Sequence, residues 1–151
     1  MGTGEGDVLY KRASLQELKS LLVVFGNAFE EPDTYQGAVP SDAYLESLLQ
    51  DETFIPLVAV VEGHVAAGLA AYVLKKFEQE RSEIYIYDLA VDENYRRRGI
   101  ATGLINKLRE IAREKGAWVI YVQADHGDDP AIRLYESLGM REEVLHFDII
   151  P

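Results

Sequence analysis

The amino-acid sequence predicts one domain of the α/β class, of the α+β type, in which helices flank a mixed central sheet. Its 151 residues suit a single domain that buries roughly two-thirds of the surface of the unfolded chain. The predicted order is two helices, three strands, then helix, strand, helix and strand. Because residues 1–151 contain no repeat, low-complexity segment or linker, we expect no internal domain boundary.

Two helices are predicted in the first third of the chain, after a start that we expect to be irregular. Ser14 is a candidate N-cap with Glu17 three residues later, which is a capping-box pattern. Apolar residues follow at helical spacing to about Phe29. Residues 30–40, EEPDTYQGAVP, contain two prolines and are predicted to form a loop. A second helix is predicted to begin after Ser41.

The middle of the chain is predicted to form strands. Residues 54–61 and 65–74 are rich in β-prone side chains, and the pair Glu62 and Gly63 between them favours a turn. These two runs are therefore predicted to form an antiparallel hairpin. The apolar run of residues 84–91 predicts a third strand.

Helices and strands alternate in the remainder of the predicted chain. Residues 99–115 carry apolar side chains at helical spacing and stop at Gly116, a residue typical of helix C-termini. Residues 118–124 are predicted to form a buried strand. Residues 130–138 are predicted to form a helix, and residues 144–149 a last strand.

The composition excludes several classes of protein. The chain is 48% hydrophobic and 27% charged, as in ordinary globular proteins. No apolar run approaches the ~18 residues of a membrane span, and the start MGTGEGD lacks the basic flank and apolar core of a signal peptide. We therefore expect a cytoplasmic protein that does not bind membranes. With no cysteine, it has no disulfide, thiolate metal site or cysteine nucleophile.

Acidic residues outnumber basic ones. Asp and Glu total 26 against 15 Lys and Arg, a net charge of −11. Such a charge repels nucleic acid and attracts small polycations, although a role in solubility alone is the alternative. The three histidines show no metal-binding spacing, so no metal site is predicted.

A cluster of arginines marks the start of the predicted helix at residues 99–115. The run Arg96-Arg97-Arg98-Gly99 stands at the predicted N-terminus of this helix. A helix N-terminus has unpaired backbone N–H groups, and the helix dipole gives it the equivalent of about half a positive charge. Alternatively, the arginines could form a solvated basic surface without a ligand. That arrangement would place cations at the positive end of the helix dipole, where they are repelled. An anion partner relieves that repulsion, so the pattern favours a phosphate site. It matches neither the P-loop nor the dinucleotide fingerprint.

Three motifs stand in the second half of the chain: the strand end DLAV at residues 88–91, Arg96-x-x-Gly99-x-Ala101, and PAIRLYESLG at residues 130–139. Together they resemble the GNAT superfamily of acetyl-coenzyme A-dependent N-acetyltransferases. Within that superfamily, AAYVLKKFEQERSEIYIYDLAV, YVQADHGDDPA and REEVLHFDI are similar to aminoglycoside 3-N-acetyltransferases of the gentamicin-modifying type. The resemblance covers nearly the whole chain. It implies the GNAT fold, with a splayed strand pair in its sheet.

The resemblance also implies a reaction and a cofactor. An acetyl group passes from acetyl-coenzyme A to the 3-amino group of an aminoglycoside antibiotic, giving resistance and leaving coenzyme A. In the family, backbone amides of the arginine-glycine loop cradle the pyrophosphate, and the preceding strand end pairs with the pantetheine arm. The implied cofactor-binding residues are Leu89, Ala90, Val91, Arg96, Arg97, Arg98, Gly99, Ile100, Ala101 and Thr102.

Two residues are candidates for the chemistry. Without a cysteine, direct attack by the amine in a ternary complex is the natural route, and it requires a base for the amine and an acid for the leaving thiolate. Asp88, beside the cofactor strand, is the candidate base, although it could instead only hydrogen-bond a neighbouring amide. The resemblance places Tyr135 where family members have an acid, although a tyrosine on such a helix could also be core.

The acidic surplus suits a substrate with several ammonium groups. Asp128 stands where many relatives have Asn, and we expect it to serve the cationic substrate. Asp33 and Glu83 are further candidates. The predicted substrate-binding residues are Tyr87, Asp125, Asp128, Asp129, Glu142, Glu143 and Asp148.

Other functions remain open from the sequence. A GNAT enzyme acting on another polyamine or on a protein N-terminus would have the same cofactor site. A silent acyl-coenzyme A binding module is the competing class of protein, against which the presence of both Asp88 and Tyr135 argues. Relatives are often dimers, which makes the predicted C-terminal strand a candidate interface.

Overall fold

The computed structural model describes residues 7–151, so the irregular start expected at residues 1–6 lies outside the described residues. The chain divides into two compact units, one ending at Tyr121 and the other running from Val122 to Pro151. Each unit is described by itself. The single domain expected for the whole chain stays a prediction.

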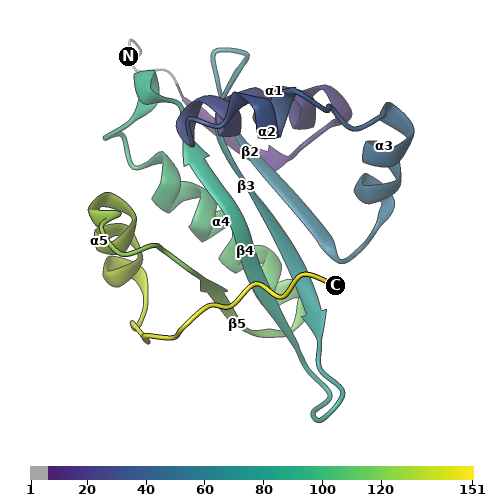
Figure 1. The fold of residues 1–151 in the computed structure, drawn as a ribbon, viewed down its shortest axis with the longest axis vertical. Helices are drawn as coiled ribbons and strands as arrows, with labels where there is room; N and C mark the ends of the chain where they lie inside the picture. Colours follow the sequence, from purple (N-terminus) through teal and green to yellow (C-terminus); the bar gives the residue numbers. More distant parts are fainter. Residues whose placement is uncertain (1–6) are drawn as a thin grey trace. The chain divides into compact units, whose positions relative to one another are not determined.

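The larger unit is built on a five-stranded sheet (Figure 1). Its strands follow the order of the sequence: β1 (Val8–Arg12), β2 (Phe54–Val61), β3 (His64–Lys75), β4 (Ser82–Val91) and β5 (Ala117–Val122). The pairs β1–β2, β2–β3 and β3–β4 are antiparallel, whereas β5 runs parallel to β4. The predicted mixed sheet is therefore confirmed.

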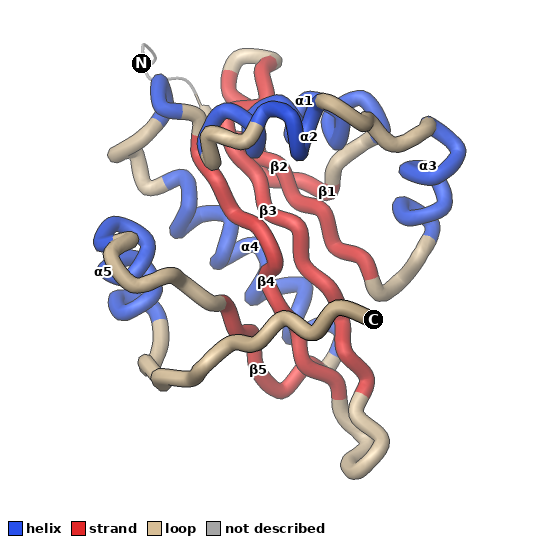
Figure 2. Tube along the Cα trace, viewed as in Figure 1, coloured by secondary structure: helices blue, strands red, loops and turns tan. Residues whose placement is uncertain are grey.

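Helices cover both faces of this sheet (Figure 2). On one face lie α1 (Leu15–Ala28), α2 (Pro32–Gln36) and α3 (Asp42–Gln50). On the other face lies α4 (Ile100–Lys115), which follows the short 3-10 turn η1 (Glu93–Tyr95). None of the helices in residues 7–151 is long and apolar enough to cross a membrane.

Each face of the sheet has its own apolar core. Beneath α1, the buried cluster includes Leu21, Val58 and Ala90. On the α4 side, Leu104 is fully buried, and β1 approaches the helix so closely that a Cβ at Gly103 would overlap the phenol ring of Tyr10. Both faces of β3 and β4 are therefore covered over part of their length, which fixes their register.

Local sequence signals explain several element boundaries. In the capping box of α1, the Ser14 hydroxyl accepts from the Glu17 N–H at 3.2 Å, and the Glu17 carboxylate accepts from the Ser14 N–H at 2.9 Å. Glu62 and Gly63 both have positive φ, 50° and 81°, which suits the tight turn of the β2–β3 hairpin. Gly116 ends α4 with φ of 70°. All three boundaries agree with the predictions from sequence.

Two elements near the start of the chain were predicted wrongly. Residues 8–12, expected to be irregular, form β1, because β2 offers hydrogen-bonding partners from Val61 to Leu57. Part of the loop predicted at residues 30–40 is the helix α2. Proline is common in loops, but Pro32 also suits the first turn of a helix, where its missing N–H costs nothing.

In the last third of the chain, one strand prediction was right in part and another was wrong. The strand predicted at residues 118–124 is present as β5, Ala117–Val122, but it is not buried, since Trp118 is 67% exposed. It stands at the end of the sheet order, and an apolar run alone does not distinguish an edge strand from a central one. Residues 144–149 form no strand. The helix of the described smaller unit is α5 (Asp129–Leu138), and residues 144–149 pair with no strand within that unit.

Candidate active site

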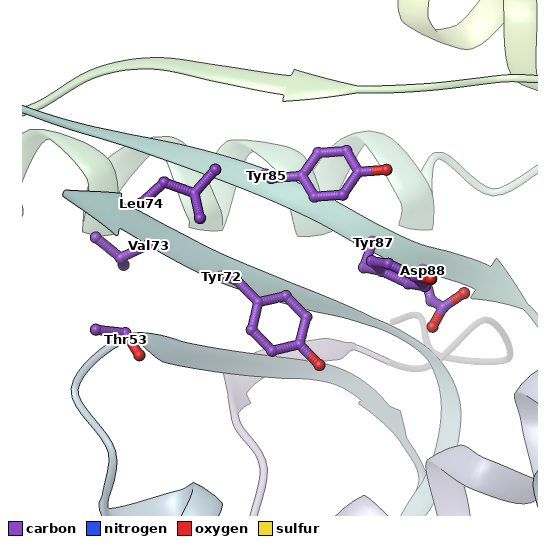
Figure 3. Close-up of a pocket in the computed structure, with 7 residues that line it drawn as sticks. All are labelled: Thr53, Tyr72, Val73, Leu74, Tyr85, Tyr87 and Asp88. Atoms are coloured by element: carbon purple, nitrogen blue, oxygen red, sulfur yellow. The ribbon is translucent and has the colours of Figure 1, made fainter. Parts of the chain in front are cut away.

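A β-bulge on β4 turns two consecutive side chains to the same face of the sheet. The register of β3 and β4 shifts between Ala70 and Ala71, so that Ala71 pairs with Ile86 and Ala70 with Asp88, leaving Tyr87 as the extra residue. In a regular strand Tyr87 and Asp88 would point to opposite faces. The bulge brings both to one face, and Figure 3 shows them beside each other. This is the face of α2, because Tyr35 of that helix hydrogen-bonds Asp88.

These side chains form one end of a groove on β3 and β4. The groove has a volume of about 550 Å³, and we call it the tyrosine groove because three tyrosine rings dominate it (Figure 3). It is open to solvent, and Tyr87 is 66% exposed. The lining residues are Thr53, Tyr72, Val73, Leu74, Tyr85, Tyr87 and Asp88.

The tyrosine rings support one another by edge contacts. The ring centroid of Tyr87 lies 6.3 Å from that of Tyr72 and 5.8 Å from that of Tyr85, both in T-shaped arrangements. Tyr85 also contacts Tyr121 of β5, with ring centroids 5.0 Å apart. Aromatic faces beside a carboxylate attract cations, so this groove suits an amine or a polyamine.

The carboxylate of Asp88 is partly withdrawn from water. The Tyr35 hydroxyl of α2 donates a hydrogen bond to Asp88 Oδ1 at 3.4 Å. Burial raises the pKa of Asp88, the Tyr35 hydrogen bond opposes that rise, and the nearby charge of Glu31 adds to it. A raised pKa brings a carboxylate nearer to the operating pH, which is the property that a general base needs.

The arginine-glycine loop joins the end of β4 to α4. Arg96 Nε donates to the carbonyl of Val91 at 3.1 Å, which ties the loop to the strand. Arg97 and Gly99 both adopt left-handed conformations, with φ of 66° and 74°. The Arg98 guanidinium lies 5.3 Å from the centroid of the Tyr95 ring.

This loop leaves the start of α4 available to an anion. No side chain caps the helix, and the Gly103 N–H donates to the Gly99 carbonyl at 3.0 Å, so the N–H groups of residues 100–102 precede the first helical bond. A Cβ at Gly99 would meet nothing within 4 Å. The exposed arginines, the helix dipole and this open approach fit a phosphate group.

The end of β4 extends past its parallel neighbour β5. Tyr121 lies beside Tyr85, and β5 ends one residue later, at Val122. Because the two strands are parallel, Leu89–Val91 lie beyond the end of β5. β5 itself therefore does not pair with Leu89–Val91.

The proposed acid and most of the predicted acidic residues belong to the smaller unit. Tyr135 lies on α5, and burial, together with the charge of Asp128, raises its pKa to about 12. Asp128 caps the same helix, since its Oδ1 accepts from the Ala131 N–H at 3.4 Å. Asp129 stands in the first turn of α5. Asp128 thus has a structural contact that the sequence analysis did not foresee.

Two of the predicted acidic residues already have cationic or ionisable neighbours. Arg141 Nη2 lies 3.4 Å from Glu143 Oε1, and His146 Nε2 lies 2.9 Å from Asp148 Oδ1. Asp125 and Glu142 are exposed. Within residues 7–151, no group of three or more His, Asp or Glu side chains is placed to hold a metal ion.

Comparison with known proteins decides the family. Residues 21–140 match the Acetyltransferase (GNAT) family. The chain belongs to this family. It is therefore an acetyltransferase with the GNAT fold, as its sheet and helices indicate.

Two solved structures are similar over almost the whole chain. One is an aminoglycoside acetyltransferase, HMB0005, from an uncultured soil metagenomic sample, with 53% identity, a TM-score of 0.93, and coverage of 96% of this chain and 99% of that one. The other, meta-AAC0020, is an aminoglycoside acetyltransferase from an uncultured soil metagenomic sample in complex with sisomicin. It shows 33% identity and a TM-score of 0.88, over 95% of this chain and 96% of that chain.

Other GNAT relatives carry names that refer to different acceptors. A ribosomal protein bS18-alanine N-acetyltransferase of Escherichia coli (strain K12) is 29% identical over 69 residues, or 46% of this chain and 47% of the relative. The match thus spans about half the length of that curated relative. An N-alpha-acetyltransferase of Sulfurisphaera tokodaii is 27% identical over 143 residues, covering 87% of this chain and 79% of the relative.

Sequence reasoning missed several residues of the site in this GNAT chain. It named Tyr87 and Asp88 but not Tyr72, which enters the groove because it pairs with Tyr85 across the β3–β4 register. It also missed Tyr35, which falls in the segment predicted as a loop. Hairpin register could have revealed Tyr72, whereas no signal in the sequence connects Tyr35 to Asp88.

The two further acidic candidates have other surroundings. Glu83 of β4 pairs with Arg81, whose Nη2 lies 3.4 Å from the carboxylate, and the Arg81 guanidinium lies 3.9 Å from the centroid of the Trp118 ring. Asp33 is exposed in the first turn of α2. Glu83 is therefore held by an ion pair, whereas Asp88 opens into the tyrosine groove.

Proposed function

We propose that this GNAT chain transfers an acetyl group from acetyl-coenzyme A to the 3-amino group of an aminoglycoside antibiotic, acting in the cytoplasm and giving resistance. The observation that carries the proposal is the half-buried carboxylate of Asp88 at the end of a groove lined by tyrosines. This arrangement suits a ring-shaped polyamine better than an uncharged acceptor. The similarity to an aminoglycoside acetyltransferase over 96% of the chain supports the same substrate class.

The proposed cofactor site runs along β4 and into α4. The backbone N–H groups of Arg97–Thr102 hold the pyrophosphate, Arg96 fixes the loop through Val91, and Leu89–Val91 pair with the pantetheine arm. The open space at Gly99 and the lack of a side-chain cap on α4 support this assignment. Acetyl-coenzyme A would supply the acetyl group as a thioester that an amine attacks directly.

Asp88 is the proposed general base. An acceptor that binds among carboxylates arrives as an ammonium ion, because acidic neighbours raise the pKa of an amine. In the proposed step the amine N–H bond breaks, and a new O–H bond forms on the Asp88 carboxylate, leaving a neutral nitrogen that can attack. The raised pKa of Asp88 supports this role because it narrows the difference between the pKa of the carboxyl group and the pKa of the acceptor ammonium.

Tyr135 is the proposed general acid. Its pKa of about 12 means that the hydroxyl keeps its proton at neutral pH and can donate it. Tyr87 lines the proposed acceptor site beside Asp88. The acidic residues proposed to attract and orient the acceptor are Asp125, Asp128, Asp129, Glu142, Glu143 and Asp148.

Acetylation of a protein N-terminus is a second candidate function. It is favoured by the match to an N-alpha-acetyltransferase over 87% of this chain. A peptide would bring one terminal ammonium group, whereas an aminoglycoside brings several. The aromatic lining of the groove and the acidic charge of the protein would therefore attract a peptide less strongly than an aminoglycoside. The two candidates predict opposite rankings of acceptors.

A thiol-release assay with a panel of amines tests the proposal. The panel contains sisomicin, sisomicin already acetylated on its 3-amino group, a linear polyamine, and a peptide with an N-terminal alanine. We expect rapid thiol release with sisomicin and loss of the reaction with its 3-N-acetyl derivative, and NMR of the product should show acetylation at the 3-amino nitrogen. Preference for the peptide would support the second candidate, and no release with any amine would support a silent binding module.

A further inference from the structure

The ring of Tyr35 is held in place by two phenylalanines of α1. Its centroid lies 6.0 Å from that of Phe25, in an edge arrangement, and 5.6 Å from that of Phe29. The two phenylalanine rings stack on each other with centroids 5.6 Å apart. Phe25 is buried in the apolar core beneath α1. The position of the Tyr35 hydroxyl is thus fixed by the core rather than by the exposed backbone of α2.

That hydroxyl is directed at one oxygen of Asp88. The Tyr35 Oη to Asp88 Oδ1 distance is 3.4 Å, which is long for a hydroxyl–carboxylate hydrogen bond. Catalytic hydrogen bonds are often long before substrate binds and shorten in the complex. Because Tyr35 is an O–H donor, it favours the charged form of the carboxylate that accepts its bond.

The other groups near Asp88 act in the opposite direction or are neutral phenols. Burial is the main cause of the raised pKa of Asp88, and the acidic charge of Glu31, at the start of α2, adds to it. Tyr72 of β3 and Tyr85 of β4 are phenols that also lie near Asp88. Burial is the main cause of the raised pKa of each, and the Asp88 charge adds to it. Tyr35 itself has its pKa raised to about 12, first by burial and then by Asp88. It therefore remains a donor at neutral pH.

We propose that Tyr35 is a positioning residue for Asp88: it holds Oδ1 and so directs Oδ2 toward the acceptor amine. The proposal rests on the proposed function, in which Asp88 is the base. The acceptor N–H proton is transferred to Oδ2, while Tyr35 keeps its own proton and takes no part in bond making. The α1 core thereby fixes the geometry of the base through Phe25 and Phe29.

The test compares three variants of the full chain. Tyr35→Phe removes the hydroxyl and keeps the ring that contacts Phe25 and Phe29. Tyr44→Phe removes a phenol from the exposed face of α3 and is the matched control. Phe29→Leu loosens the ring contacts but leaves the Tyr35 hydroxyl in the chain, so it tests the role of the α1 residues.

The first readout is the titration of the Asp88 carboxyl carbon by NMR in the free protein, which needs no acceptor. In Tyr35→Phe we expect the Asp88 titration to move to higher pH, since a contact that favours the ionised form is lost. Phe29→Leu should move it in the same direction by a smaller amount, and Tyr44→Phe should leave it unchanged. An unchanged Asp88 titration in folded Tyr35→Phe would overturn the proposal.

The second readout is acetyl transfer at saturating amine. Loss of one hydrogen bond should lower kcat roughly threefold to tenfold, with a smaller change in KM, and should shift the acidic limb of the pH profile upward. Equal losses in Tyr35→Phe and Tyr44→Phe would contradict the inference. If the wild-type chain acetylates no amine, the proposed function fails on that assay alone, while the Asp88 titration still decides whether Tyr35 controls the carboxylate.

Discussion

Two glycines at opposite ends of α4 give a matched test of the proposed phosphate site. Gly99 and Gly116 have φ of 74° and 70°, and a Cβ at either one would meet nothing within 4 Å. Alanine at either position therefore costs only the strain of a left-handed backbone, about 1 to 2 kcal/mol. For a chain of this size that loss lowers Tm by roughly 2 to 8 °C. The two variants should be destabilised to a similar degree.

Their affinities for acetyl-coenzyme A should differ. At Gly99 the added Cβ enters the space through which a phosphate would approach the N–H groups of α4, and losing one hydrogen bond to a charged group costs about 1.5 to 3 kcal/mol. Gly99→Ala should thus bind acetyl-coenzyme A about tenfold to a hundredfold more weakly than wild type, and Gly116→Ala should bind it normally. Calorimetric titrations and thermal melts measure both quantities. Equal affinities in the two folded variants would refute the assignment of the loop.

Three further outcomes are expected. At saturating cofactor, acceptor affinity should fall as salt rises, because screening shortens from about 8 Å to about 3 Å between physiological ionic strength and 1 M; a flat response would remove the role given to the acidic residues. Tyr135→Phe should lower kcat roughly a hundredfold or more if its hydroxyl is the acid, and a wild-type kcat would exclude it. Gly103→Ala should destabilise the fold by about 1 to 3 kcal/mol, since the new methyl group would overlap Tyr10, and a normal melting temperature would contradict this packing.

The sequence predicted elements whose signals are local. The capping box at Ser14, the turn at Glu62 and Gly63, and the glycine that ends α4 each act through their own backbone, so the pattern alone located α1, the hairpin and α4. It failed where the outcome depends on a distant partner. Residues 8–12 become a strand only because β2 lies beside them, and residues 144–149 lack such a neighbour within their own unit.

In the candidate site, too, the residues with local sequence signals could be predicted, whereas those that depend on distant partners could not. The arginines and Gly99 mark the start of α4 by their order in the chain, and Asp88 could be named because it adjoins that loop. The bulge at Tyr87 could not be predicted, because it arises from the register with Ala70 and Ala71. Strict alternation would have placed Tyr87 and Asp88 on opposite faces. Tyr35 reaches Asp88 across 53 residues of sequence and is visible only in the folded chain.

Turnover of Asp88→Asn at saturating acetyl-coenzyme A and aminoglycoside tests the central claim most directly. The substitution keeps the size of the side chain and an oxygen that can accept from Tyr35, but it cannot take a proton from the acceptor. Because both substrates are saturating, a fall in kcat reports the lost proton transfer and not weaker binding of the acceptor. Glu83→Gln, on the same strand and paired with Arg81, is the control and should keep near-normal turnover.

If Asp88 is the base, Asp88→Asn should lose roughly 10²- to 10⁴-fold in kcat, the usual range for removal of a general base. A kcat close to that of wild type across neutral pH, in a variant that still folds and binds both substrates, would contradict it. If Glu83→Gln then lost the activity instead, the base would be Glu83, acting through water.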